Sequence, residues 1–272
     1  PFLPKGLPAV LTFYDLVAYF FPGSMRAIHK LQHRLSQKYS MNRAAEILTI
    51  SAQTGDDLVR LFQCPREKVR PALLGYLEPP SLKKPTEKLA SLPAKFMLAV
   101  STLEPRKNYS TLLKAYRIYL EKERRNPMPL VIAGRRGWES PEFYEMLETM
   151  LVETRSLFLM DDLSDSELKY LYDHCSFFAM SSLYEGFGLP LLEAMASGKF
   201  ALASDLPCFH EIGGNQFQYL PPTDANSWAQ AIADSARLAR EGRLRKMKFS
   251  KKEWSWEKTA SLHLEAFERL LS

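Results

Sequence analysis

Short apolar or β-branched runs alternate with helical patterns along the chain, and this alternation constrains the fold most. The predicted strands are Ala9–Phe13, Ile47–Ile50, Lys95–Val100, Leu130–Ala133, Leu157–Met160, Phe177–Met180 and Phe200–Ala203. The predicted helices are Asn108–Arg124, Pro141–Thr154, Asp165–His174, Leu189–Ser197, Ala225–Leu238 and Trp256–Leu270. Strands and helices in this order build βαβ units, so we predict an α/β fold with a doubly wound parallel sheet.

A proline-rich stretch divides the chain. Residues 78–85 read Glu-Pro-Pro-Ser-Leu-Lys-Lys-Pro and cannot continue a helix or a central strand. Only about three strands are visible before it, too few for a complete Rossmann-like domain of roughly 100–150 residues. We therefore expect residues 1–78 to be the last portion of one domain, 79–93 a linker, 94–255 a second domain and 256–272 a C-terminal helix.

Composition excludes several classes of protein. The chain is 46% hydrophobic, but no apolar stretch of about 18 residues predicts a membrane span. Cys64, Cys175 and Cys208 are odd in number and far apart, which argues against a disulfide framework. They are expected to be core thiols of a protein in a reducing, cytoplasmic setting.

The net charge of +5 is unevenly distributed, because residues 16–45 contain no Asp or Glu. Arg26, Lys30, Arg34 and Lys38 recur every four residues there, a spacing that places them on one face of a helix. Two interpretations stay open: a solvated surface face, or peripheral contact with anionic lipid head groups or a phosphorylated acceptor. Nucleic-acid binding is disfavoured, because aromatic residues are not interleaved with these charges and no known binding motif is present.

The first informative loop, residues 101–108, follows the predicted strand that ends at Val100. Ligands of doubly wound sheets bind outside the carboxyl ends of the strands. Arg106 and Lys107 lie in this loop, and Asn108 is expected to cap the following helix. An anion there would meet two cations and the helix amides. The alternative is a pair of solvated loop charges.

The second informative loop follows the strand Phe177–Met180. Glu185 lies on it, and Glu193 follows eight positions later on a helix. Gly186 and Gly188 let the backbone approach a ligand closely near the start of that helix, a favourable place for a diphosphate. Two carboxylates so placed can accept hydrogen bonds from sugar and ribose hydroxyls. The alternative makes them a turn residue and a surface helix residue.

The segment from Glu185 to Glu193 resembles the glutamate–seven residues–glutamate motif of a large family of retaining glycosyltransferases with the GT-B fold. This is the glycosyl transferases group 1 family, which includes bacterial mannosyl- and glucosyltransferases. The resemblance runs from about Pro8 to the C-terminus and includes segments 104–108, 133–138, 185–190 and 254–260. It implies a donor-binding Rossmann-like domain, an incomplete Rossmann-like acceptor-side portion before it, and a final helix that crosses back to that portion.

The resemblance also implies roles for individual residues. Arg106 and Lys107 would hold the donor diphosphate and stabilise it as the leaving group. Glu185 would bind the donor sugar, and Glu193 the ribose. The remaining donor-binding residues implied are Gly134, Arg135 and Leu163 along the cleft and the base, and Gly186, Phe187, Gly188 and Leu189 at the distal phosphate.

One position departs from the family pattern. The family carries His-Asp-Leu facing the donor sugar, whereas this chain has Tyr14-Asp15-Leu16. Tyr14 is the implied catalytic counterpart; it can donate a hydrogen bond but cannot become a cation near neutral pH. No Asp-x-Asp triplet for a divalent metal is present. Two cations and a helix terminus can supply the compensating charge, so no metal or other cofactor is expected.

The resemblance therefore implies transfer of a hexose, with retained configuration, from GDP-mannose or a UDP-hexose to a saccharide or lipid-linked saccharide. The Gly-Arg-Arg-Gly-Trp segment at 134–138 is most similar to mannosyltransferases. A catalytically weak or inactive nucleotide-sugar-binding protein or fragment is the alternative that Tyr14 leaves open. A nicotinamide dehydrogenase would need a Gly-x-Gly-x-x-Gly turn, which the chain lacks. The expected location is cytoplasmic, with peripheral contact at the inner membrane face left open.

Overall fold

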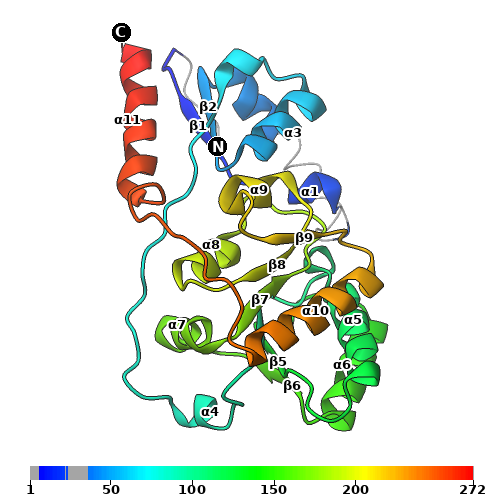
Figure 1. The fold of residues 1–272 in the computed structure, drawn as a ribbon. Coiled ribbons are helices and arrows are strands. Elements are labelled where there is room, and N and C mark those ends of the chain that lie inside the picture. The colour runs from blue at the N-terminus through cyan, green and yellow to red at the C-terminus, as the bar shows by residue number, and fades with distance from the viewer. Residues whose placement is uncertain (1–5, 22, 24–35, 272) are drawn as a thin grey trace. The chain divides into compact units, whose positions relative to one another are not determined.

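The computed structural model describes residues 6–21, 23 and 36–271, which form two compact units (Figure 1). Unit 1 comprises Pro1–Leu77, Tyr184–Gly188 and Ser250–Ser272. Unit 2 comprises Glu78–Leu183 and Leu189–Phe249. The short segment Tyr184–Gly188 thus packs with unit 1, although it joins two elements of unit 2 along the chain.

Unit 2 is built on a six-stranded, all-parallel sheet with the order β6-β5-β4-β7-β8-β9. The strands are β4 (Met97–Val100), β5 (Leu130–Ala133), β6 (Leu157–Met160), β7 (Phe177–Met180), β8 (Ala201–Ser204) and β9 (Gln218–Leu220). All four residues of β5, β7 and β8 are buried, as expected for strands covered by helices on both faces.

The helices of unit 2, apart from the short first one, cover the two faces of this sheet (Figure 1). They are α4 (Glu87–Ala90), α5 (Tyr109–Lys122), α6 (Pro141–Glu153), α7 (Asp165–His174), α8 (Leu189–Ala196), α9 (Pro207–Gly213) and α10 (Ala225–Arg240). Helices α5 and α6 lie on one face with α10, which packs on α5, while α7, α8 and α9 lie on the other. Ser164 begins α7 with a capping box, in which its hydroxyl and the Glu167 carboxylate satisfy each other's backbone amides.

Unit 1 contains a three-stranded parallel sheet with the order β1-β2-β3. Its elements are β1 (Val10–Phe13), α1 (Val17–Phe20), β2 (Glu46–Thr49), α3 (Ala52–Phe62), the 3-10 turn η2 (Arg66–Lys68), β3 (Val69–Pro71) and α11 (Trp256–Leu271). The hydrophobic core on one side of this sheet includes Phe13, Leu16, Ile47 and Leu58. On the other side Ala266 of α11 packs on β2, and Arg269 pairs with the buried Glu46 at 2.6 Å.

The predicted α/β class is confirmed, and every predicted strand appears within two residues of its expected limits. Three elements that matter for the site or the sheets were missed: α3, β3 and β9. The expected core thiols are confirmed, because all three cysteines are free and buried. No helix among the described residues is long and apolar enough to cross a bilayer.

The basic stripe lies mostly outside the described residues, which exclude Arg26, Lys30 and Arg34. Lys38 is described: it is exposed on a helix that covers residues 36–43.

Candidate functional site

The loops after β4 and β7 meet at the point where the strand order of unit 2 reverses. These two strands are neighbours, and the helices that follow them leave to opposite faces. The Leu183 amide donates to the Arg106 carbonyl at 2.8 Å, and the Asn108 side-chain amide donates to the Ser181 carbonyl at 2.9 Å. The structure therefore brings the two loops together at the crevice where doubly wound sheets bind ligands.

Arg106 is held more firmly than an exposed loop residue would be. It lies in the 3-10 turn η3 (Pro105–Lys107), and its guanidinium pairs with the Glu104 carboxylate at 2.6 Å. Only 16% of the Arg106 side chain and 6% of the Glu104 side chain are exposed. The alternative of two solvated loop charges does not describe these residues: Lys107 is half-buried, and Arg106 belongs to a nearly buried ion pair.

Asn108 occupies the N-cap position of α5 as expected, but its side chain makes no capping hydrogen bond. Its backbone adopts a left-handed conformation with φ 58°, which asparagine tolerates better than most residues. Its side-chain amide instead donates to two carbonyls, those of Ser181 and Pro222. Asn108 thus connects the loop after β4 to the loops after β7 and β9.

A cavity of about 360 Å³ opens at the carboxyl ends of β4, β5 and β6. Its lining includes Gly134 and Arg135 after β5 and the stretch 160–163 after β6, which ends at Leu163. Gly134 is required because a Cβ at this position would overlap the carbonyl of Ser101 in the loop after β4. The structure therefore brings the residues expected along the cleft and the base into one pocket of unit 2.

Glu193 lies half-buried on α8, facing the buried Tyr172 of α7. Burial raises the pKa of the Glu193 carboxyl; the Tyr172 phenol opposes this shift, and Asp165 adds to it. The pKa of Tyr172 is raised far more, mainly by its complete burial. Glu193 is therefore not the surface helix residue of the alternative interpretation, since its carboxylate is partly removed from water.

The segment that carries Glu185 belongs to unit 1. Glu185 is only 6% exposed and Phe187 3%, whereas Leu189, at the start of α8 in unit 2, is 39% exposed. Gly186 packs against the strand end that carries Tyr14, because a Cβ on it would overlap the Tyr14 carbonyl. Gly188 adopts a φ of 122°, a conformation that side-chain-bearing residues rarely adopt.

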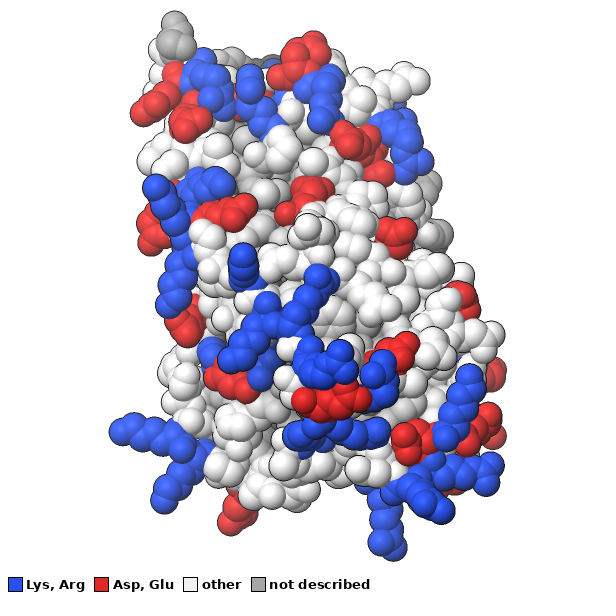
Figure 2. Space-filling view, in the orientation of Figure 1, with Lys and Arg blue, Asp and Glu red and all other residues white. Residues whose placement is uncertain are grey.

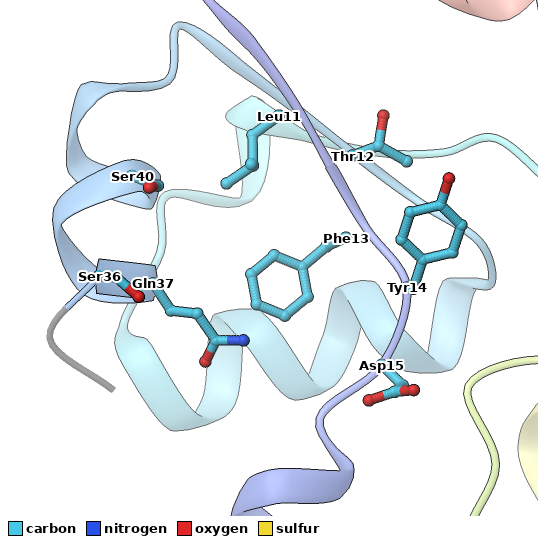
Figure 3. Close-up of a pocket in the computed structure, with 8 residues that line it drawn as sticks. All are labelled: Leu11, Thr12, Phe13, Tyr14, Asp15, Ser36, Gln37 and Ser40. Atoms are coloured by element: carbon cyan, nitrogen blue, oxygen red, sulfur yellow. The ribbon is translucent and has the colours of Figure 1, made fainter. Parts of the chain in front are cut away.

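Tyr14 lies at the edge of a second cavity, of about 370 Å³, at the carboxyl end of β1 in unit 1 (Figure 3). Leu11 and Phe13 point toward the helix 36–43, whereas Thr12 and Tyr14 point to the other side of the strand. Tyr14 is 61% exposed, so the residue is accessible to solvent and to a ligand.

Sequence reasoning missed two residues next to the candidate site. Glu104 is the first residue of the motif at 104–108. Nothing in its spacing shows that it is the buried partner of Arg106 rather than a solvated loop residue. Tyr172 lies on a predicted helix, but its position beneath Glu193 depends on how α7 packs beside α8. Among the described residues, no three His, Cys, Asp or Glu side chains gather as ligands for a metal ion.

Comparisons with known proteins agree on the family. The model of glycosyl transferases group 1 matches residues 83–254. The chain is 31% identical to O-antigen chain mannosyltransferase B of Escherichia coli over 99% of its length, and 27% identical to O-antigen chain mannosyltransferase RfbU of Salmonella typhimurium over 84%. It spans 72% and 61% of those two proteins, respectively.

Solved structures identify the fold. HepE of Anabaena in complex with UDP and glucose matches with a TM-score of 0.71 at 16% identity, covering 96% of this chain and 72% of that one. At this identity the likeness shows the fold alone, a GT-B arrangement of two Rossmann-like sheets. The family match and the 31% identity to O-antigen chain mannosyltransferase B show that the chain belongs to the glycosyl transferases group 1 family.

Proposed function

We propose that this protein transfers a hexose, most specifically mannose from GDP-mannose, to a saccharide or lipid-linked saccharide, with retained anomeric configuration. The observation that carries the proposal is the hydrogen-bonded contact between the loops after β4 and β7, which places Arg106 and Lys107 beside the loop that leads to Glu185. Family membership and the names of two O-antigen mannosyltransferases support the reaction class and the sugar.

In this proposal the residues of unit 2 bind the nucleotide. The diphosphate contacts Arg106, Lys107 and the amides at the start of α8 near Leu189, while Glu193 accepts hydrogen bonds from the ribose hydroxyls. A guanidinium supplies two parallel donors that match phosphate oxygens, and the ammonium adds a compact charge. The segment of Glu185, Gly186, Phe187 and Gly188 serves the sugar and the distal phosphate.

The rim of the nucleotide cavity favours guanine over uracil. Asp161 and Asp162 both line the cavity after β6, beside the apolar Met160 and Leu163. A carboxylate accepts two adjacent hydrogen bonds from the N1–H and N2–H groups of guanine. Uracil offers a single N–H between two carbonyl acceptors, which a carboxylate repels.

This preference can be measured in variants that remove the charge. Replacing Asp161 and Asp162 by Asn, singly and together, should weaken GDP binding by about tenfold or more in at least one variant, because a charged hydrogen bond is worth about 1.5–3 kcal/mol. UDP binding should change little. Equal losses for both nucleotides would show that these carboxylates do not read the base.

The chemistry follows from where charge develops. When the bond from C1 of the sugar to the diphosphate breaks, negative charge grows on the leaving oxygen, and preorganised cations stabilise it most effectively there. Arg106 and Lys107 take this role in place of a divalent metal. Retention places the attacking acceptor hydroxyl on the face that the diphosphate leaves, and Tyr14 donates a hydrogen bond to the sugar at the family's histidine position.

Turnover with GDP-mannose and a mannose-terminated saccharide acceptor tests the proposal, with the anomeric configuration of the product read by NMR. The expected product has the α-configuration of the donor. Lys107→Met should lose at least tenfold in rate, whereas Lys114→Met, an exposed lysine on α5, should not. Binding of GDP-mannose without transfer to any acceptor would favour a nucleotide-sugar-binding protein, and an inverted product would contradict retention.

Peripheral contact with an anionic membrane at its cytoplasmic face is also proposed, because a lipid-linked acceptor would be presented there. Lys and Arg side chains gather on the face shown in Figure 2, where the chain leaves α10. Exposed cations of this stretch are Arg243, Arg245, Lys246 and Lys248. Each cation near an anionic surface contributes about 1 kcal/mol. Binding to anionic vesicles should therefore occur at low salt and fade at high salt. Identical sedimentation of wild type and a variant with Arg243, Arg245, Lys246 and Lys248 replaced by Ser would contradict the role of this stretch. The same comparison with Arg26, Lys30, Arg34 and Lys38 replaced by Ser tests the basic stripe.

A further inference from the structure

The N-terminal half of α3 holds the segment that carries Glu185 at three successive residues. The Tyr184 hydroxyl donates to the Asp57 carboxylate at 3.3 Å, and the Gln53 side chain donates to the Glu185 carbonyl at 3.4 Å. The Thr54 hydroxyl donates to the Gly186 carbonyl at 3.2 Å. All of these residues belong to unit 1.

The contacts made by Thr54 and Tyr184 are buried, and the contact made by Gln53 is partly buried. Thr54 is fully buried, and its hydroxyl also accepts from Ser51, the residue that caps α3. Asp57 is 8% exposed and pairs with Arg60 at 2.7 Å, so its charge is compensated. A buried carbonyl or phenol that loses its partner costs more than the bond contributes, because no water replaces it.

Tyr184 reaches Asp57 from a fixed position. Its ring packs on Phe20 of α1 with the ring centroids 4.5 Å apart, and only 6% of the residue is exposed. Burial, together with the charge of Asp57, raises the pKa of the Tyr184 phenol, so the hydroxyl stays protonated and remains a donor at every physiological pH.

Fixing the carbonyls of Glu185 and Gly186 orients the peptide groups on the carboxyl side of Glu185, and the anchored Tyr184 ring fixes the chain on its amino side. The direction in which the Glu185 side chain leaves the backbone is then set by α3. Gly186 completes the arrangement, because the absence of a Cβ lets the segment contact the Tyr14 carbonyl directly.

We propose that α3 positions Glu185 for sugar transfer, with Thr54 and Tyr184 as the positioning residues. This rests on the proposed role of Glu185 in binding the donor sugar. Neither residue contacts the donor in this account. Their loss should therefore lower kcat far more than nucleotide affinity, since residues of unit 2 supply most of the proposed contacts to the nucleotide.

Thr54→Val and Tyr184→Phe remove one hydroxyl each and keep the shape of the side chain. Each should lower kcat by about 10- to 100-fold, because a shift of about 1 Å in a reacting group costs about 100-fold. The Kd for GDP should stay within about twofold of wild type. Thr54→Ser restores the hydroxyl and should recover most of the rate. Asp56→Asn, an exposed neighbour on the same helix, is the matched control and should behave as wild type.

Hydrogen exchange makes the test independent of turnover. The amides of residues 185–188 should exchange about five- to tenfold faster in Thr54→Val and Tyr184→Phe than in Asp56→Asn, because one buried hydrogen bond is lost. Unchanged exchange overturns the positioning role, whether or not the wild type transfers sugar. Absence of sugar transfer by the wild type contradicts the proposed function alone. Faster exchange with an unchanged kcat also overturns the positioning role, because loosening the segment would then have no effect on the contribution of Glu185 to the rate.

Discussion

Replacing Arg106 by Met removes a guanidinium from a nearly enclosed ion pair and leaves the Glu104 carboxylate buried without it. Breaking such a pair on one side costs roughly 3–5 kcal/mol. For a domain of the size of unit 2 this corresponds to a fall in Tm of about 6–20 °C, at about 2–4 °C per kcal/mol. The 6% exposure of the Glu104 side chain is what makes the cost large, because an exposed pair would contribute less than about 1 kcal/mol.

The double variant Glu104→Gln/Arg106→Met separates this folding cost from the loss of ligand binding. It removes both charges, and a neutral pair of similar volume is close to neutral in stability. Its Tm should therefore recover most of the loss seen in Arg106→Met. Affinity for GDP, measured by equilibrium dialysis, should stay at least tenfold weaker than wild type in both variants, because both lack the guanidinium.

Two results would refute this reasoning. If Arg106→Met melts at the same temperature as wild type, burial of the Glu104 carboxylate does not depend on the ion pair for its stability. If the double variant binds GDP as tightly as wild type, Arg106 contributes nothing to diphosphate binding, and the proposed role of η3 is wrong.

Three further predictions follow from the same geometry. Because burial raises the pKa of Glu193, GDP affinity should decline as the pH falls through a range above that of an ordinary glutamate, and Glu193→Gln should abolish this dependence; an identical pH profile in the variant would contradict the assignment. The raised pKa also means that the folded state binds this proton more tightly than the unfolded state does, so protonation of Glu193 should stabilise the fold while it weakens binding. Gly134→Ala should displace the loop after β5 from the Ser101 carbonyl and weaken GDP binding by tenfold or more while unit 2 still folds, whereas an unchanged Kd would show that this loop is not part of the nucleotide site. Donor binding and transfer should persist in excess EDTA, and a strict need for magnesium or manganese would contradict the role given to Arg106 and Lys107.

The sheet of unit 2 was predictable because its central strands are short, continuous apolar runs that need no partner to be recognised. Strand β7 is the clearest case, since its four residues are all buried and its predicted limits are the observed ones. Edge strands carry less signal: β9 begins with the exposed Gln218, and β3 ends in a proline, which is tolerated at the edge of a sheet but does not indicate a strand.

Helix α3 was missed for a different reason. Its first half contains Gly55 and two aspartates, which have weak helix propensity, and the helix is stabilised by the Ser51 cap and by burial of Leu58. Those tertiary contacts are not visible in a local pattern. The same holds for the candidate site, where motif spacing located Arg106 and Glu185 but the partners that hold them, Glu104 and Thr54, come from packing.

Calorimetric titration of the protein with GDP and UDP tests the central claim most directly, because it measures binding at the proposed nucleotide site of unit 2 without needing the acceptor. The account predicts that GDP binds more tightly than UDP, and that an Arg106→Met/Lys107→Met variant with wild-type secondary structure binds neither measurably. Failure of both nucleotides to bind wild type, or undiminished binding by that variant, would contradict the assignment of the site.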